Sequence, residues 1–109
     1  MMTIDEYQEE ASKTSIEGTP QWYPILGLSG EAGEVMELLK KEIRDNNYLK
    51  TGVFGERVQL LVELGDTLWY IAEIATRFGW SLEMIAQLNL DKLQDRKKRG
   101  VLHGKGDDR

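Results

Sequence analysis

Apolar residues recur at every third or fourth position through most of the chain, which is the spacing of amphipathic helices. No segment alternates apolar and polar residues as a half-buried strand would. We therefore expect an all-α, four-helix-bundle-like fold in a single domain, 1–109. The predicted helices run from Ile4 to about Lys13, from Pro24 to about Arg44, through the apolar segment that ends at Phe78, and from Ser81 to about Arg99.

The predicted helix ends carry residues that commonly begin or stop a helix. Thr3 and Glu6 have the spacing of a capping box, and Pro24 suits a first helical turn. Gly79 and Gly100 suit the position just after a helix end. Loops rich in Gly, Pro, Asn and hydroxyl residues separate the first three helices, at 15–20 and 45–55.

The third predicted helix is apolar over a wider arc than one neighbouring helix can cover. Its apolar side chains sweep about 200° of the helical wheel. A chain of 109 residues also has a small core of its own. We therefore expect a homodimer or homotetramer, in which a second copy covers this helix.

Composition and charge narrow the classes of function. The chain is 40% hydrophobic and 30% charged, as in soluble domains, and no apolar run approaches a membrane span. An acidic start in place of a basic signal sequence favours the cytoplasm. The absence of cysteine excludes disulfides and thiolate chemistry. A net charge of −5 argues against nucleic acid, although half of the 14 Lys and Arg residues lie after position 91.

Two pairs of acids carry the candidate chemistry. Glu31 and Glu34 lie three residues apart on the second predicted helix, and Glu63 and Asp66 do so on the third. If these helices pack antiparallel, four carboxylates converge and repel one another unless a cation neutralises them. Oxygen ligands without His or Cys select Mg²⁺, with Mn²⁺ as a substitute.

Acid pairs of this spacing also occur by chance on solvated helix faces. Here glycines accompany the pairs, at positions 30, 33 and 65, inside helices that are otherwise strongly helix-forming. Glycine leaves room for a backbone or a ligand to approach closely, which favours a site over a plain solvated face.

The segments that contain these acids resemble the MazG-like nucleotide pyrophosphohydrolases, over nearly the whole chain. They read GLSGEAGEV at 27–35, ELGDTLWY at 63–70 and NLDKL at 89–93, followed by Arg96 and by a tail at 99–109 similar to that of short family members. The resemblance implies an oligomeric helical bundle, Mg²⁺ held by the four acids, and cleavage of nucleoside triphosphates to monophosphate and pyrophosphate. Many members have a further Glu where this chain has Gly30, so no general base is carried over there.

We assign the catalytic and metal-binding roles to the four acids. A metal bound by Glu31, Glu34, Glu63 and Asp66 would activate the attacking water, and one of the same acids would take its proton.

The candidate substrate-binding residues lie elsewhere on the chain. Lys92 and Arg96 could neutralise the leaving pyrophosphate, although a solvated basic face explains them almost as well. Asn89 and Tyr70 match family positions and could hydrogen-bond the substrate. Trp22 could stack on a base, or anchor the core.

Other functions remain open on the sequence. Within the superfamily, a dUTPase or a phosphoribosyl-ATP pyrophosphohydrolase would share the acids. A non-catalytic helical dimerisation module would explain the apolar third helix but leaves the matched acids unexplained. Di-iron bundles are excluded, because their Glu-x-x-His pairs need more than the single histidine present.

Overall fold

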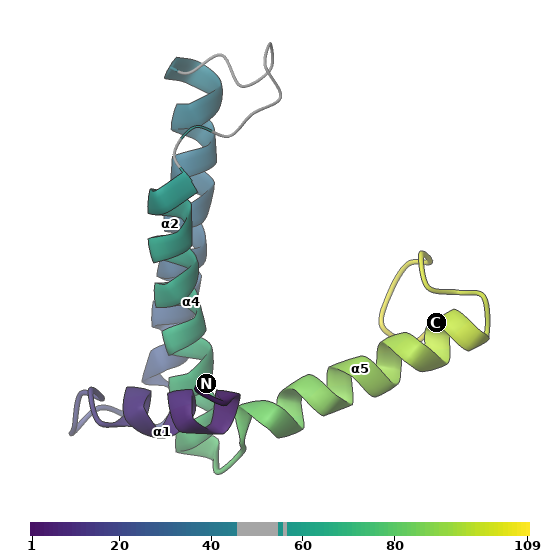
Figure 1. Ribbon diagram of the computed structural model, residues 1–109, viewed down its shortest axis with the longest axis horizontal. Coiled ribbons are helices and arrows are strands. Elements are labelled where there is room, and N and C mark those ends of the chain that lie inside the picture. The colour runs from purple at the N-terminus through teal and green to yellow at the C-terminus, as the bar shows by residue number, and fades with distance from the viewer. Residues whose placement is uncertain (46–54, 56) are drawn as a thin grey trace.

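The structure, a computed structural model, describes residues 1–45, 55 and 57–109. These residues form helices and no strands, which confirms the all-α prediction. Each predicted helix boundary lies within one residue of the observed one, while the predicted loop at 45–55 falls almost entirely outside the described residues. The helices are α1 (Ile4–Ser12), α2 (Tyr23–Asp45), α4 (Arg57–Phe78) and α5 (Leu82–Lys98) (Figure 1).

Local hydrogen bonds explain where these helices begin and end. The Thr3 hydroxyl accepts from the Glu6 amide at 3.1 Å, and the Glu6 carboxylate accepts from the Thr3 amide at 3.3 Å, so the predicted capping box is present. Ser81 caps α5 by accepting from the Met84 amide at 3.0 Å. Gly79 adopts a φ of 78° and thereby stops α4 in a conformation that disfavours residues with a Cβ.

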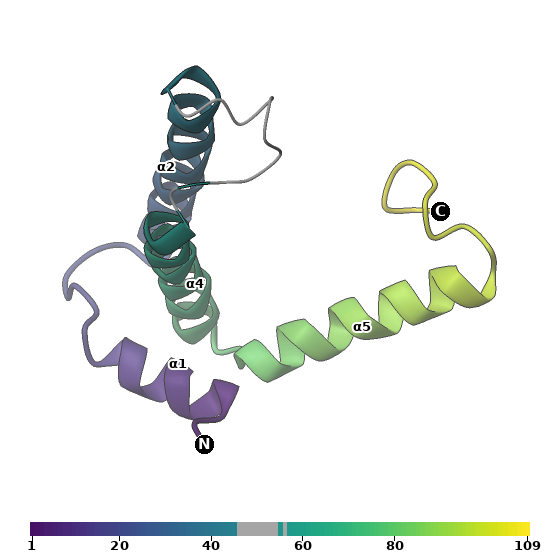
Figure 2. The ribbon, with the colours of Figure 1, turned by 45° about the horizontal axis from the view of Figure 1, so that its top comes forward.

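The long helices α2 and α4 lie side by side and antiparallel, as the acid pairs require (Figures 1 and 2). The short helix α1 lies across the end of α4. In both views α5 projects away from the α2–α4 pair, so one chain does not close the four-helix bundle that the sequence predicts. The reason is local: the turn at Gly79 sends the chain outward before α5 begins.

The core is small and lies where α1, α4 and α5 meet. Within the described part of the chain its buried apolar residues are Ala72, Ala75 and Leu82. The Gln8 side chain of α1 joins the three helices, because it donates to the Thr76 hydroxyl of α4 at 3.1 Å and accepts from the Leu82 amide of α5 at 2.8 Å. Polar bonds thus supplement a core that is too small to hold the helices by apolar burial alone.

Large apolar side chains remain exposed along α2, α4 and α5. Leu61, Leu64 and Leu68 of α4 are exposed to 70%, 50% and 37%, at positions that form one stripe. Leu88 of α5 is exposed to 65%. A monomeric soluble protein rarely leaves so much contiguous apolar surface in water. None of the described helices is both long and apolar enough to cross a membrane.

A buried ion pair holds the α1–α2 loop against α4. Arg77 pairs with Glu73 at 2.9 Å, and these side chains are only 14% and 3% exposed. The same guanidinium donates to the carbonyls of Pro20 at 2.6 Å and Ile16 at 3.2 Å. Ser15 donates to Glu73 at 2.6 Å. One charged pair on α4 therefore fixes the path of the loop that leads into α2.

Arg77→Met should lower the free energy of unfolding by about 3 kcal/mol, because it leaves the Glu73 charge buried without its partner. Urea denaturation at fixed protein concentration measures the change. The double variant Glu73→Gln/Arg77→Met should lose less than the single one, since no uncompensated charge remains. A single variant as stable as the wild type would show that the pair does not anchor the loop.

Candidate active site

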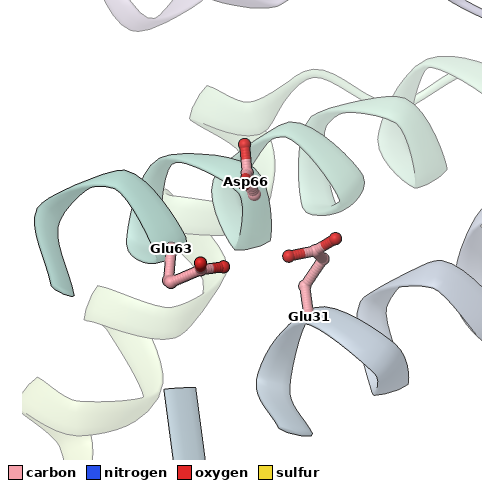
Figure 3. A group of neighbouring side chains, drawn as sticks. All are labelled: Glu31, Glu63 and Asp66. Carbon is pink, nitrogen blue, oxygen red and sulfur yellow. The ribbon is translucent and has the colours of Figure 1, made fainter. Parts of the chain in front are cut away.

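Three carboxylates meet where the middle of α2 faces the middle of α4. Glu31 projects from α2, and Glu63 and Asp66 project from α4 (Figure 3). One oxygen from each lies within 4.8 Å of the others. Glu31 and Glu63 are half-buried and Asp66 is exposed, so the cluster is open to solvent on one side. The antiparallel packing of two helices thus brings acids far apart in sequence to one point.

Neighbouring groups on α4 fix Glu63. The Gln59 amide, one turn earlier, donates to the Glu63 carboxylate at 2.7 Å. The Thr67 hydroxyl donates to the Glu63 main-chain carbonyl at 2.9 Å. The bond from Gln59 leaves further lone pairs of the carboxylate available, so Glu63 is held in place and can still bind a cation.

The cluster makes ionisation of Glu31 unfavourable. Burial raises the pKa of Glu31 above its ordinary value, and the neighbouring carboxylates raise it further, in the order Asp66, Glu63, Glu34. The Tyr7 pKa is also raised, by burial and then by the charge of Asp66. The negative charge of the cluster therefore reaches α1 as well.

Glu34 does not join the three-acid group, although it was expected to be a fourth ligand. It is exposed on α2, and its carboxylate is not among the oxygens that lie within 4.8 Å of one another. Its charge still contributes to the raised pKa of Glu31, so it lies nearby. As a metal ligand Glu34 remains a prediction.

A pocket of about 400 Å³ opens beside the acids, lined by Thr14, Glu31, Asp66, Trp69 and Tyr70. The Trp69 indole N–H donates to the Thr14 hydroxyl at 2.7 Å, which fixes the ring against the α1–α2 loop. Trp69 and Tyr70 meet edge to face, with ring centroids 4.9 Å apart. The pocket therefore combines two acids with two aromatic rings, a lining that suits a small organic anion bound together with a cation.

Glycine has a clear role at Gly27 in α2. A Cβ at this position would collide with the Tyr70 ring, so only glycine lets α2 and Tyr70 approach as they do. The glycines singled out earlier behave differently. A Cβ at Gly30, Gly33 or Gly65 would meet no atom within 4 Å. The expectation that another part of this chain's backbone approaches closely is therefore wrong at these three positions. The space beside them is open, so a ligand could still approach there.

The other predicted substrate-binding residues lie away from the acids within one chain. Asn89 and Lys92 line a second cavity, of about 540 Å³, along α5. Arg96 is 4% exposed and is covered by the C-terminal tail. Trp22 is 56% exposed just ahead of α2. Of the five predicted substrate-binding residues, only Tyr70 lines the pocket beside Glu31 and Asp66.

Several contributors to the site were not predicted from the sequence. Thr14 and Trp69 line the pocket, Gln59 orients Glu63, and Gly27 admits Tyr70. Gln59 carried a usable signal, because it lies one helical turn before Glu63. The role of Thr14 depends on the path of a loop, which local sequence spacing does not encode.

Comparison with known families agrees with this geometry. A model of the MazG nucleotide pyrophosphohydrolase domain matches residues 24–101. The chain belongs to this family. The matched MazG segment contains the acids of both pairs, Tyr70, Asn89, Lys92 and Arg96, whereas Trp22 lies outside it.

The chain is also similar to the Gene 37 protein of Mycobacterium phage L5. The two are 43% identical over 120 residues, which cover 99% of this chain and all of the phage protein. No solved structure was found to match. The MazG family indicates a nucleotide pyrophosphohydrolase, a class that is generally metal-dependent, and the acidic cluster is a candidate metal site.

Glu31→Gln should stabilise the metal-free protein at neutral pH. With a raised pKa, the folded state binds more protons than the unfolded state between the ordinary and the raised value, so the free energy of unfolding falls as pH rises through that window. The neutral amide avoids this loss. Melting temperatures of the two proteins in a chelator should therefore diverge as the pH rises above the ordinary carboxyl pKa of 4.5.

Added Mg²⁺ should make the melting temperature of the wild type higher than that of Glu31→Gln. The ion stabilises the wild type by mass action, and it finds fewer ligands in the variant. Glu37→Gln is the control: it removes a carboxylate of the same helix whose contact is an exposed ion pair with Lys40, so its melting curves should stay close to those of the wild type. Parallel melting curves for Glu31→Gln and the wild type in both conditions would refute electrostatic strain at the cluster.

Proposed function

We propose that this MazG protein hydrolyses ribo- or deoxyribonucleoside triphosphates to the monophosphate and pyrophosphate, with Mg²⁺ at the acidic cluster. The observation that carries the proposal is the cluster of Glu31, Glu63 and Asp66 at the edge of an aromatic-lined pocket. Family membership supports the class of reaction. We infer Mg²⁺ from the donor set, and a nucleoside triphosphate from the pocket beside it.

The donor set fits a hard divalent cation. All three groups offer carboxylate oxygens, which suit Mg²⁺ and Mn²⁺ better than zinc or copper. Glu31, Glu63 and Asp66 would hold the ion, which would supply coordination for phosphate oxygens and a water of lowered pKa as the nucleophile. Asp66 is the most open of the three acids, so we expect phosphate to approach from its side.

The residues around the cluster would hold the nucleotide and receive the proton. One of the clustered acids would take the proton of the attacking water, and Glu31, which faces both Glu63 and Asp66 from the opposite helix, is the base that we propose. Tyr70 lines the pocket together with Glu31 and Asp66, where its hydroxyl could donate to phosphate. Trp69 offers a ring that the Thr14 bond has already oriented, and such a ring can stack on a base at little further entropic cost.

The identity of the products distinguishes pyrophosphate release from γ-phosphate hydrolysis. Incubation of a nucleoside triphosphate with the protein and Mg²⁺, followed by ³¹P NMR, should show pyrophosphate and monophosphate. Glu63→Gln should lower kcat by about 100-fold or more, as for loss of one positioned catalytic group, with a smaller effect on KM. Glu37→Gln is again the matched control. Nucleoside diphosphate with orthophosphate would mean γ-phosphate hydrolysis, and no turnover across a panel that includes dUTP and phosphoribosyl-ATP would favour a non-catalytic dimerisation module.

We also propose that the working form is a homodimer or homotetramer. The stripe of Leu61, Leu64 and Leu68 on α4 is exposed although α4 is packed against α2 and α1. A second copy that covers this stripe would bury apolar surface that the small core of one chain leaves in water. In one chain α5, with its cationic residues, projects away from the helix pair that carries the acids, so we propose that the α5 of another copy supplies cations to the site.

Light scattering should therefore return a mass above the 12.5 kDa of one chain at micromolar concentration. Leu61→Glu should shift the protein toward the monomer, because it places a charge in the covered stripe. Gln94→Glu adds the same charge at an exposed polar position of α5 and should leave the mass unchanged. A wild type that stays at the mass of one chain would contradict this proposal.

A further inference from the structure

The tail after α5 is folded into a closed loop. The Arg109 guanidinium donates to the carbonyls of Val101 at 3.0 Å, Leu102 at 3.2 Å and Gly106. The Arg99 guanidinium donates to the carbonyl of Arg109 at 2.7 Å, which joins the end of the chain to the end of α5. These bonds give the tail a defined shape without an apolar core.

This loop places one carboxylate on two cations of α5. Asp107 lies 3.3 Å from Arg96 and 3.5 Å from Lys92, measured to the same carboxylate oxygen. Arg96 also donates to the Asp107 main-chain carbonyl at 2.8 Å. Arg96 is 4% exposed, whereas the Asp107 side chain is 86% exposed. The tail therefore covers the guanidinium while its own carboxylate stays in contact with water.

The arrangement matters because a carboxylate and a phosphate compete for the same donors. Arg and Lys bind both groups through charge-assisted hydrogen bonds. The two cations, first Arg96 and then Lys92, hold the pKa of Asp107 below its ordinary value, so this carboxylate is charged at neutral pH. Any phosphate that binds the Lys92–Arg96 pair must meet a site already filled by an anionic group of the same chain.

We propose that Lys92 and Arg96 form an oxyanion site that Asp107 occupies in the free protein, so that binding of a polyphosphate releases the tail from α5. The site takes phosphate or pyrophosphate groups, and Asp107 is its built-in competitor. The proposal rests on the proposed function only for the identity of the anion, since the contacts of Asp107 are independent of any reaction. Because Asp107 is exposed, its ion pairs with Lys92 and Arg96 are weak enough for a phosphate to displace them, since exposed ion pairs contribute little.

The neighbouring residue supplies a matched control. Asp107→Asn removes the charge that contacts Lys92 and Arg96. Asp108→Asn removes the same charge one residue further on, where the side chain is exposed. Any general effect of net charge on anion binding is therefore common to the two variants, and the difference between them reports on the contact.

The probe is inorganic pyrophosphate, titrated calorimetrically into the full-length protein in the presence of a chelator. We expect Asp107→Asn to bind it about two- to fivefold more tightly than Asp108→Asn, which is the range set by an exposed ion pair. Equal affinities in the two variants, weaker binding by Asp107→Asn, or no binding to either would overturn the proposal.

Hydrogen exchange of the tail amides gives a second readout. Pyrophosphate should speed exchange at 101–109 in the wild type, because it displaces Asp107 and frees the loop from α5. Slower exchange would mean that the tail closes over the anion, and would overturn the proposal that the anion releases the tail. Both measurements use neither a divalent metal nor turnover, so a failure of the proposed reaction is distinguishable from a failure of this inference.

Discussion

Repulsion among three carboxylates is the constraint on which the functional part of this structure depends. Glu31, Glu63 and Asp66 are brought together only because α2 and α4 pack antiparallel and in register at their middles. The pKa of Glu31 is raised first by burial and then by the charges of Asp66 and Glu63, so part of the shift is the cost of that convergence. A fold that keeps such a cluster without a cation loses stability for no structural gain, and this links the geometry of the helix pair to metal-dependent phosphate chemistry.

The scaffold that holds the acids depends on a few polar anchors. Ala72, Ala75 and Leu82 form a core at one end of α4, while the Glu73–Arg77 pair fixes the loop before α2 and thereby Thr14 and Trp69. The apolar faces of α2, α4 and α5 remain open, which fits a chain whose core is completed by another copy. The helix α5, which carries Lys92 and Arg96, projects away from the α2–α4 pair that carries the acids, so we propose that assembly and catalysis are connected.

Much of the fold followed from local sequence signals. Helix boundaries were predictable because Thr3, Ser81 and Gly79 act on their own neighbours, and the acid pairs because spacing fixes which residues share a helix face. The exclusion of Glu34 from the cluster was not predictable, since it depends on the rotation of α2 about its axis. The direction of α5 and the covering of Arg96 by the tail depend on tertiary contacts, which the hydrophobic periodicity of the sequence does not predict.

The central claim is that the acids of α2 and α4 form a divalent-cation site. Crystals grown with Mn²⁺, a substitute for Mg²⁺ that scatters anomalously, test it most directly. We expect an anomalous difference peak between Glu31, Glu63 and Asp66, with carboxylate oxygens at about 2.0–2.3 Å, near the Mg²⁺ distance. The peak should vanish in Glu63→Gln. Ordered wild-type crystals with no peak there, or with Mn²⁺ bound only elsewhere, would contradict the account.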